Sequence, residues 1–191
     1  MQSIKTKLKS LMSNKRFEHS LNVAKFAKTL ALSHNADTEK AYIAGLIHDS
    51  AKEFNPEKCK KYNITLENEL HDIFDSYQDI WHALIVDQFA DQVFGINDKE
   101  TLNAAKYHCT GKRSMSKLAK IVFIADYLDP LRQLKDQSEI ESLAKKSLNQ
   151  AMLKVLINTI QHLINNRCMI YEDTIDCYND ITEQIRGEGI S

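Results

Sequence analysis

Glycine and proline are scarce in this sequence, which has five glycines and two prolines among 191 residues. Domains rich in β-strands need these residues at their many tight turns, so their scarcity argues against a sandwich or a barrel. Helix-forming residues dominate instead, and the chain is long enough to bury one sizeable core. The sequence therefore predicts an all-α fold.

The sequence also lacks several features that would assign it to another class. Its four cysteines form no Cys-x-x-Cys pair, which argues against a structural zinc site and a thioredoxin motif. Charges interrupt the basic start before any signal-peptide run, and no apolar stretch reaches membrane-spanning length. A net charge of −1 gives no overall field that would favour nucleic acid or membranes. We expect a cytoplasmic protein with reduced thiols and no nucleic-acid or membrane partner.

The most informative segment of the sequence is a short apolar stretch followed by a histidine and an aspartate. Residues 44–52 read Ala-Gly-Leu-Ile-His-Asp-Ser-Ala-Lys, and Asp37 is placed to cap the helix that leads into them. Small residues on the inner face of this helix would let a neighbouring backbone approach closely. His48 and Asp49 are predicted to bind a metal ion; the alternative is an ordinary polar pair at a helix end.

Further ligands are expected from other helices. His19 shares the inward face of a helix expected over residues 16–33, because apolar residues follow it at i, i+3, i+4 spacing. Asp126 lies on the core-facing stripe of a strongly apolar helix, where a carboxylate is costly unless it is paired or binds metal. His82 and His108 also lie in helical apolar contexts. Taken singly, an inward histidine is more often a hydrogen-bonded core residue than a ligand.

Basic residues follow several of these candidates. Lys52 is interpreted either as a phosphate contact or as a solvated cation that interacts favourably with the helix dipole. The turn with Lys112 and Arg113 is either a basic lip that meets phosphates or an ordinary exposed loop. Arg132 stands just beyond the point where Asp129-Pro130 ends the Asp126 helix.

The last third of the sequence is predicted to be largely helical. Apolar spacing indicates a long amphipathic helix over residues 148–164, whose apolar side chains are most simply core. This helix could also serve a homodimer interface. A tail with Tyr171 and Thr174 follows it.

Five motifs taken together make the sequence recognisable. They are Arg16-x-x-His19, His48-Asp49-x-x-Lys52, Trp81-His82-Ala83, Tyr107-His108-x-Thr110-Gly111 and Ala125-Asp126-Tyr127. In this order they resemble the HD-domain metal-dependent phosphohydrolases, and more narrowly the YqeK branch of bacterial symmetrical diadenosine tetraphosphate hydrolases. The resemblance covers residues 14–180. It implies a single HD domain over residues 1–191, with a metal-binding bundle over 14–130 and a C-terminal helical extension over 137–191.

The resemblance also implies roles for individual residues. The implied metal ligands are His19, His48, Asp49 and Asp126. His82 and His108 would be either ligands of a second metal ion or contacts to the substrate. The implied catalytic residues are Asp49, Lys52, His82 and His108. The implied substrate contacts are Arg16, His19, Lys52, Trp81, His82, His108, Thr110, Arg132, Tyr171 and Thr174. The tail departs from the family pattern, because Glu172-Asp173-Thr174 replaces the usual Pro-x-Thr.

The residue types agree with this chemistry. Imidazole and carboxylate ligands suit iron, manganese, cobalt or zinc, and the resemblance favours iron, as one or two ions. Such an ion lowers the pKa of bound water to about 7 and neutralises charge on phosphoryl oxygens. Hydroxide formed there is expected to attack an inner phosphorus of diadenosine tetraphosphate and give two ADP. Asp49 could bind the ion and also orient or deprotonate the water.

Two other functions remain open from the sequence. Another HD-type enzyme, acting on a nucleoside monophosphate, a cyclic dinucleotide or a guanosine alarmone, would share the metal residues but not the Trp81 and Tyr107 motifs. The other is a catalytically silent helical module that binds a nucleotide or a protein. Loss of a metal residue would favour it, and none is lost.

Overall fold

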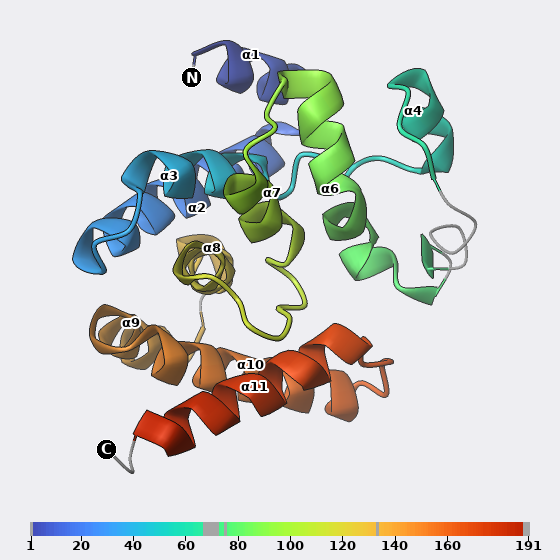
Figure 1. Ribbon diagram of the computed structural model, residues 1–191. Helices are drawn as coiled ribbons and strands as arrows, with labels where there is room; N and C mark the ends of the chain where they lie inside the picture. The colour runs from blue at the N-terminus through green and yellow to red at the C-terminus, as the bar shows by residue number, and fades with distance from the viewer. Residues whose placement is uncertain (1, 67–72, 75, 133, 189–191) are drawn as a thin grey trace.

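The computed structural model describes residues 2–66, 73–74, 76–132 and 134–188, and within these ranges the chain is helical and has no β-strand (Figure 1). The all-α prediction is confirmed. The helices are α1 (Gln2–Leu11), α2 (Asn14–Ser33), α3 (Thr38–Ile47), α4 (Pro56–Lys61), α6 (Gln78–Phe94), α7 (Lys99–Lys106), α8 (Lys117–Tyr127), the 3-10 turn η1 (Pro130–Arg132), α9 (Gln137–Lys146), α10 (Leu148–Asn165) and α11 (Glu172–Glu188).

Short polar side chains begin many of these helices. Ser13, Asp37, Asp98 and Ser116 each accept a hydrogen bond from a backbone N–H in the first turn of the helix that follows. Such caps satisfy amides that have no partner within the helix. At the other end of α6, Gly95 adopts a left-handed conformation with φ of 68° and ends the helix.

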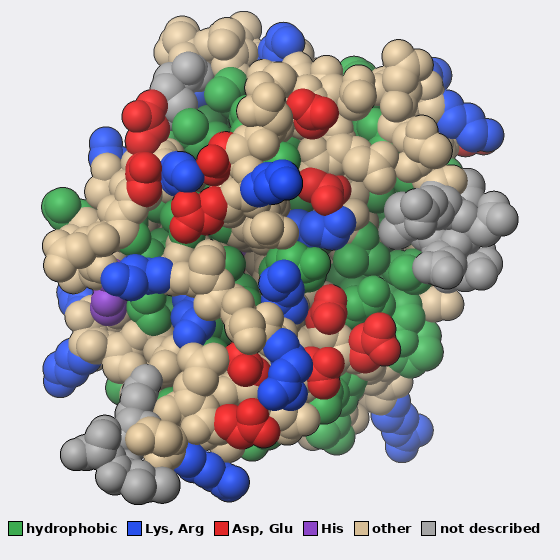
Figure 2. Space-filling model, viewed as in Figure 1, with side chains coloured by type: hydrophobic (Ala, Val, Ile, Leu, Met, Phe, Trp, Pro, Cys, Tyr) green, Lys and Arg blue, Asp and Glu red, His purple; other side chains and the backbone are tan. Residues whose placement is uncertain are grey.

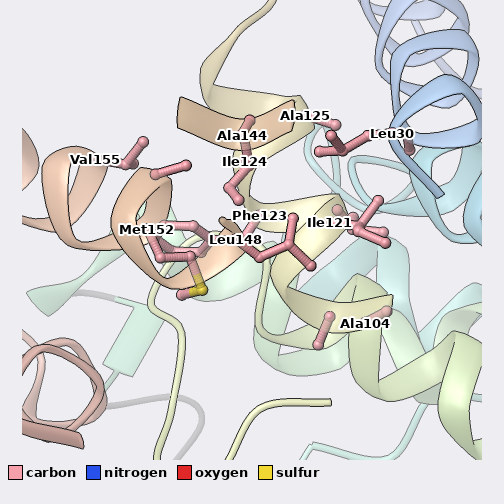
Figure 3. Close-up of a cluster of buried hydrophobic side chains, with 14 of the residues drawn as sticks. Leu30, Ala104, Ile121, Phe123, Ile124, Ala125, Ala144, Leu148, Met152 and Val155 are labelled. Carbon is pink, nitrogen blue, oxygen red and sulfur yellow. The ribbon is translucent and has the colours of Figure 1, made fainter. Parts of the chain in front are cut away.

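Helix α8 lies at the centre of the packing. It contacts α2, α3 and α7 on one side and α10 on the other, and Figure 1 shows it almost end-on between these two groups. Its apolar side chains are buried almost without exception. Figure 3 shows Ile121 and Ile124 of α8 with Leu148 and Met152 of α10 in one cluster. Asp126 therefore lies on a helix that is surrounded by packed side chains.

Helices α2 and α3 pack closely at Gly45. A Cβ atom added to Gly45 would lie 2.9 Å from the Cα of Ala24 and 3.2 Å from the carbonyl carbon of Val23. A larger residue would therefore collide with the backbone of α2 and not with a flexible side chain. The predicted close approach is present, and it brings the helix that carries His19 next to the helix that ends at His48.

The segment after residue 171 forms α11, which lies within the helical extension that the resemblance implied for residues 137–191. The face that α11 buries consists of Thr174, Cys177, Asp180 and Ile181. These positions have helical spacing, but only two of them are apolar, so the periodic signal is weak. Gly111, with φ of 65°, packs against this face: a Cβ there would lie 2.5 Å from the Sγ of Cys177.

The surface carries charges of both signs. Figure 2 shows acidic and basic side chains interspersed over the face that is also seen in Figure 1. This mixing agrees with the net charge of −1. In the described part of the chain, no helix combines the length and the apolar character that a membrane crossing requires.

Candidate metal centre

The predicted metal ligands come together at the ends of two helices and the middle of a third. His48 is the C-terminal cap residue of α3, Asp49 follows it in a turn, and Asp126 lies in the last turn of α8. His19 lies within α2, which crosses next to both. His48 and Asp49 are thus at a turning helix end, where adjacent side chains can face a common point.

Four donor atoms of these residues face each other at ligand spacing. His19 Nε2 lies 3.1 Å from His48 Nε2 and 3.1 Å from Asp126 Oδ1, and His48 Nε2 lies 3.6 Å from Asp126 Oδ1. Asp49 Oδ2 lies 3.5 Å from His19 Nε2 and 3.7 Å from His48 Nε2. Ligands bound at about 2.0 to 2.2 Å to one tetrahedral ion are roughly 3.4 Å apart. The donors of His19, His48 and Asp126 therefore fit a single transition-metal ion, and Asp49 Oδ2 lies near enough to both imidazoles to join them.

The hydrogen positions of the two imidazoles also fit a cation. His48 Nδ1 donates to the carbonyl oxygen of Gly45 at 2.7 Å, and His19 Nδ1 donates to the carboxylate of Asp129. In each neutral ring the hydrogen is then on Nδ1, so Nε2 presents a lone pair. Two lone pairs that face each other at 3.1 Å repel unless a cation lies between them. The donor set matches a metal ion in chemistry as well as in spacing.

Asp49 faces a second group of side chains with its other oxygen. Its Oδ1 lies 2.9 Å from His82 Nε2 and 3.6 Å from His108 Nε2, and these two nitrogens are 3.2 Å apart. Cys109 Sγ lies 3.0 Å from His108 Nε2. His108 Nδ1 donates to the carbonyl oxygen of Ala105 at 2.7 Å, so its Nε2 also presents a lone pair.

His82 differs from the other three histidines. Its Nδ1 faces Lys52 Nζ at 3.3 Å, and Lys52 also donates to the carbonyl oxygen of Asp79 at 2.7 Å. A lysine ammonium can only donate, so His82 Nδ1 accepts and the ring hydrogen is on Nε2. His82 therefore donates a hydrogen bond to Asp49 Oδ1, whereas His19, His48 and His108 present lone pairs.

Both carboxylates are anionic at neutral pH. Burial alone would raise their pKa values, but the imidazoles of His48, His108 and His82 hold the pKa of Asp49 well below its usual range. For Asp126, the imidazoles of His19 and His48 and the charge of Arg132 likewise outweigh burial and lower the pKa strongly.

The imidazoles divide into two groups by pKa. Burial lowers the pKa of His82 to about 3 and also lowers the pKa of His108, so both rings are neutral at pH 7. Burial acts in the same direction on His19, but the carboxylates of Asp126 and Asp129 outweigh it and raise its pKa. A positive charge is thus favoured at the point where the carboxylates meet, which is the point that a metal ion would occupy.

Arginines pair with both ligand carboxylates. Arg16 Nη1 donates to Asp49 Oδ2 at 2.6 Å, and Arg132 Nη2 donates to Asp126 Oδ1 at 2.8 Å. Both guanidinium groups are partly exposed, with side-chain exposures of 33% and 42%. They lie beside the centre and face solvent, where they can reach an anionic ligand.

Two cavities are lined by candidate ligands of the centre, and a third shares Asp79, Ile80, Cys109 and Thr159 with the first of them. The α8–α10 cavity, of about 550 Å³, is lined by Asp79, Ile80, His108, Cys109, Phe123, Asp126, Tyr127, Arg132, Leu134, Val155, Asn158, Thr159 and His162. The α2 cavity, of about 300 Å³, is lined by Ser13, Lys15, Arg16, His19, Asp129, Leu131 and Arg132. The tyrosine cavity, of about 430 Å³, is lined by Ser76, Tyr77, Gln78, Asp79, Ile80, Cys109, Thr159, Leu163, Arg167, Cys168, Met169, Tyr171 and Thr174. Arg132 lines the first two.

The other predicted site residues lie at varying positions around this centre. Tyr171 and Thr174 line the tyrosine cavity, where the ring of Tyr171 meets that of Tyr77 at 5.3 Å. Trp81 is 1% exposed and belongs to a hydrophobic cluster, with its ring 5.0 Å from that of Phe74. Thr110 is buried, and its hydroxyl donates to the carbonyl oxygen of Gly111 at 2.9 Å.

The two cations of the turn after His108, Lys112 and Arg113, contact side chains of the same protein. Lys112 Nζ lies 4.6 Å from the ring centroid of Tyr107, and Arg113 donates to Glu183 of α11 at 3.1 Å. Both cations thus have partners within the chain.

Sequence reasoning missed several residues that adjoin the centre. Asp129 was interpreted only as the end of a helix, but its carboxylate contacts His19. Val155 packs in the core, and it also lines the α8–α10 cavity together with Asn158 and Thr159, which sequence reasoning did not indicate. Periodicity marks an inward-facing position, but it does not separate a packed core from a cavity wall.

Comparison with known proteins agrees with this geometry. The model of the HD domain family matches residues 16–131, which include all four candidate ligands. The chain belongs to the HD domain family. It is similar to proteins named symmetrical bis(5'-nucleosyl)-tetraphosphatase: one of Staphylococcus aureus is 34% identical over 98% of this chain and 99% of its own. One of Bacillus subtilis is 32% identical over 90% of this chain and 92% of its own.

A solved HD structure resembles the whole fold. The crystal structure of a predicted HD superfamily hydrolase involved in NAD metabolism, from Clostridium acetobutylicum, is 36% identical to this chain. It matches with a TM-score of 0.85 and covers 96% of this chain and 97% of its own. The HD family and the buried His/Asp cluster together are typical of a metal site in this fold.

Proposed function

We propose that this HD-family chain is a metal-dependent hydrolase that cleaves diadenosine tetraphosphate symmetrically into two ADP. One observation carries the proposal: buried imidazole and carboxylate donors meet at metal spacing beside cavities that basic residues line. The relatives named as symmetrical tetraphosphatases, which match nearly the full length, support this substrate.

We propose iron as the metal, held by His19 Nε2, His48 Nε2, Asp49 Oδ2 and Asp126 Oδ1. When bound, such an ion supplies a Lewis acid for phosphoryl oxygens and makes a bound water acidic enough to react near neutral pH. Manganese, cobalt and zinc accept the same mixed nitrogen and oxygen ligands. His82 is a poor ligand for a second ion while Lys52 holds its ring hydrogen on Nε2.

The arginines are proposed to hold the polyphosphate. Arg16 pairs with Asp49, Arg132 pairs with Asp126, and both arginines line the α2 cavity. Guanidinium groups bind phosphate oxygens through paired hydrogen bonds, so they can place an inner phosphorus next to the centre and stabilise the leaving ADP. The bridging oxygen between the two middle phosphorus atoms leaves with one ADP, and the oxygen of water joins the other.

Asp49 is proposed to accept the proton of the attacking water, with His82 and Lys52 holding its carboxylate in place. Asp49 is anionic and accepts a hydrogen bond from His82, whose neutral ring is oriented by Lys52. Asp49 can therefore orient the water and accept its proton at a carboxylate oxygen. Lys52 also neutralises charge that moves into this group.

The α8–α10 cavity is proposed to receive one nucleoside. Its volume of about 550 Å³ lies within the range of about 300 to 1,000 Å³ that is usual for small-molecule sites. Ile80, Phe123 and Val155 give it apolar walls for a base. Asn158 donates from its amide nitrogen to Tyr127 and Asp136, which fixes its orientation in the wall.

Product analysis tests this function. Protein reconstituted with iron or manganese is incubated with diadenosine tetraphosphate, and the nucleotides are separated by chromatography. We expect ADP alone from the parent and strongly reduced turnover from Asp126→Asn. Asp180→Asn is the matched control, because Asp180 is also a buried carboxylate but hydrogen-bonds to Ser114 and Gln184. AMP with ATP, or no cleavage at all, would contradict the proposal.

A further inference from the structure

The imidazoles that present lone pairs at the centre are not all held by the same kind of acceptor. His48 and His108 each donate from Nδ1 to the backbone carbonyl oxygen three residues earlier, on Gly45 and Ala105. Both histidines lie at the C-terminal end of a helix, α3 or α7. The last carbonyl groups of a helix have no partner in the helix, so they are available to a side chain.

His19 has no such carbonyl group. It is the sixth residue of the 20-residue helix α2, where the carbonyl oxygens of the preceding turn accept the hydrogen bonds of the helix itself. The ring must therefore find an acceptor on another element. That acceptor is Asp129, whose Oδ2 lies 2.5 Å from His19 Nδ1.

Asp129 is itself held firmly. Its carboxylate is only 3% exposed, and its other oxygen accepts a hydrogen bond from the backbone N–H of Leu131 at 3.2 Å. Its carbonyl oxygen accepts from the backbone N–H of Arg132 at 2.9 Å. The turn that leaves α8 thus presents one oxygen of Asp129 to His19 and keeps the other occupied.

We infer that Asp129 is a positioning residue for the metal centre, which acts through the ring of His19. By accepting from Nδ1, the carboxylate selects the tautomer whose Nε2 lone pair faces Asp126 and His48, and it fixes the plane of the ring. Its negative charge also makes the imidazole a stronger electron-pair donor. The inference rests on the proposed metal site, but not on the identity of the nucleotide.

This arrangement concentrates three functions in a seven-residue segment. Asp126 supplies a ligand, Asp129 orients a ligand on another helix, and Arg132 supplies a cation beside Asp126. The helix α8 and the 3-10 turn η1 fix the spacing between them. The whole segment from Asp126 to Arg132, and not Asp126 alone, therefore shapes the centre where α8 ends.

Metal affinity tests the inference without reference to catalysis. Cobalt(II) is titrated into the parent, Asp129→Asn and Asp129→Ala, and its visible absorption gives both the dissociation constant and the ligand geometry. We expect Asp129→Ala to weaken binding about 10-fold to 100-fold, as is usual when the partner of a metal-binding histidine is lost. Asp129→Asn keeps an acceptor oxygen but no charge, so its loss should be smaller. Asp180→Asn, a buried carboxylate elsewhere, should bind like the parent.

A double variant separates positioning from a general loss of structure. If Asp129 acts through His19, Asp129→Ala should weaken cobalt binding no further once His19→Ala is present. Parent-like affinity in Asp129→Ala and Asp129→Asn, or an additional loss in the double variant as large as in the single one, would overturn the inference. Should Asp129→Ala fail to fold, parent-like affinity in Asp129→Asn alone would overturn it. A parent that binds no cobalt would instead contradict the proposed metal site.

Discussion

Asp49 divides its two oxygens between two groups of side chains. Oδ2 faces His19 and His48, and Oδ1 accepts a hydrogen bond from His82. Replacing Oδ1 with an amide nitrogen would place an N–H donor against the N–H of His82, and replacing Oδ2 would remove an anionic ligand of the proposed cation. The residue is therefore not exchangeable for its neutral isostere on either side.

This division predicts the effect of Asp49→Asn. We expect turnover of diadenosine tetraphosphate to fall at least about 100-fold, because a ligand charge and a proton acceptor are lost together. Metal affinity should fall as well. Circular dichroism should still show a helical protein, because asparagine preserves the volume. Activity within a few-fold of the parent would show that Asp49 has neither role.

For single residues, the sequence indicated which side chains come together at the metal centre but not how each side chain is oriented. His19, His48, Asp49 and Asp126 could be singled out because polar residues on apolar helix faces are conspicuous. Asp129 could not, since an aspartate before proline is already explained as a helix end. Its contact with His19 joins residues 110 positions apart, and such a contact depends on the packing of α2 against α8.

At the scale of elements, the packing of α2 on α3 depends on the missing side chain of Gly45. Alanine in a helix is usually more stable than glycine by about 0.5 to 1 kcal/mol. Here the added Cβ would meet backbone atoms at 2.9 to 3.2 Å, which forces the helices apart. The clash should outweigh the propensity, because overpacking typically costs about 1 to 3 kcal/mol.

We therefore predict that Gly45→Ala lowers the free energy of unfolding and also weakens metal binding, since His48 is held by the carbonyl oxygen of Gly45. Gly187→Ala in α11 is the matched control: nothing lies within 4 Å of its added Cβ, so it should be neutral or slightly stabilising. Urea denaturation measures both. A Gly45→Ala protein as stable as the parent would contradict the close packing.

The cap of α7 gives an element-scale prediction for pH. Two hydrogen bonds from Thr101 and one from Lys40 lower the pKa of Asp98 from 3.8 to about 2. Because the folded pKa lies below the unfolded value, the stabilisation is present above 3.8 and is lost as the pH falls toward 2. Asp98→Ala should cost about 0.5 to 2 kcal/mol near neutral pH.

Urea denaturation at several pH values checks this dependence. The stability difference between the parent and Asp98→Ala should shrink as the pH falls below about 4. Asp98→Asn keeps a capping oxygen without the charge, so its stability should stay closer to that of the parent at neutral pH. A difference that is constant with pH would show that the charge of Asp98 contributes nothing.

Helices α10 and α11 mark the limit of what periodicity can predict. The long helix α10 was expected from its apolar spacing, whereas α11 shows only a weak apolar period because Thr174 and Asp180 occupy buried positions. The same spacing could not show that Val155 and Thr159 face a cavity. A residue that faces inward contacts whatever the other helices leave there, and that depends on tertiary packing.

At the scale of the whole molecule, the all-α fold followed from composition because few turn residues leave helices as the remaining choice. The burial of α8 between two groups of helices explains why the centre is largely shielded from solvent. His19, His48, Asp49 and Asp126 are each less than a tenth exposed. Mutual repulsion of the buried anions in such a site favours folding with a cation bound.

Metal removal should therefore lower the stability of the whole protein. An ion that binds only the folded state adds about 2.7 kcal/mol when its free concentration is 100 times its dissociation constant. We expect the Tm to fall when a chelator removes the ion and to recover when manganese or cobalt is restored. The Tm of Asp126→Ala should respond far less. Equal Tm values with and without metal would indicate that no ion links these helices.

Donor atoms from α2, the end of α3 and α8 are proposed to bind one cation, and anomalous scattering shows whether they do. Crystals of the cobalt-loaded protein are measured above and below the cobalt absorption edge. We expect an anomalous peak about 2.0 to 2.2 Å from His19 Nε2, His48 Nε2, Asp49 Oδ2 and Asp126 Oδ1. A fully loaded protein whose peak lies elsewhere, or that shows none between these atoms, would contradict this proposal.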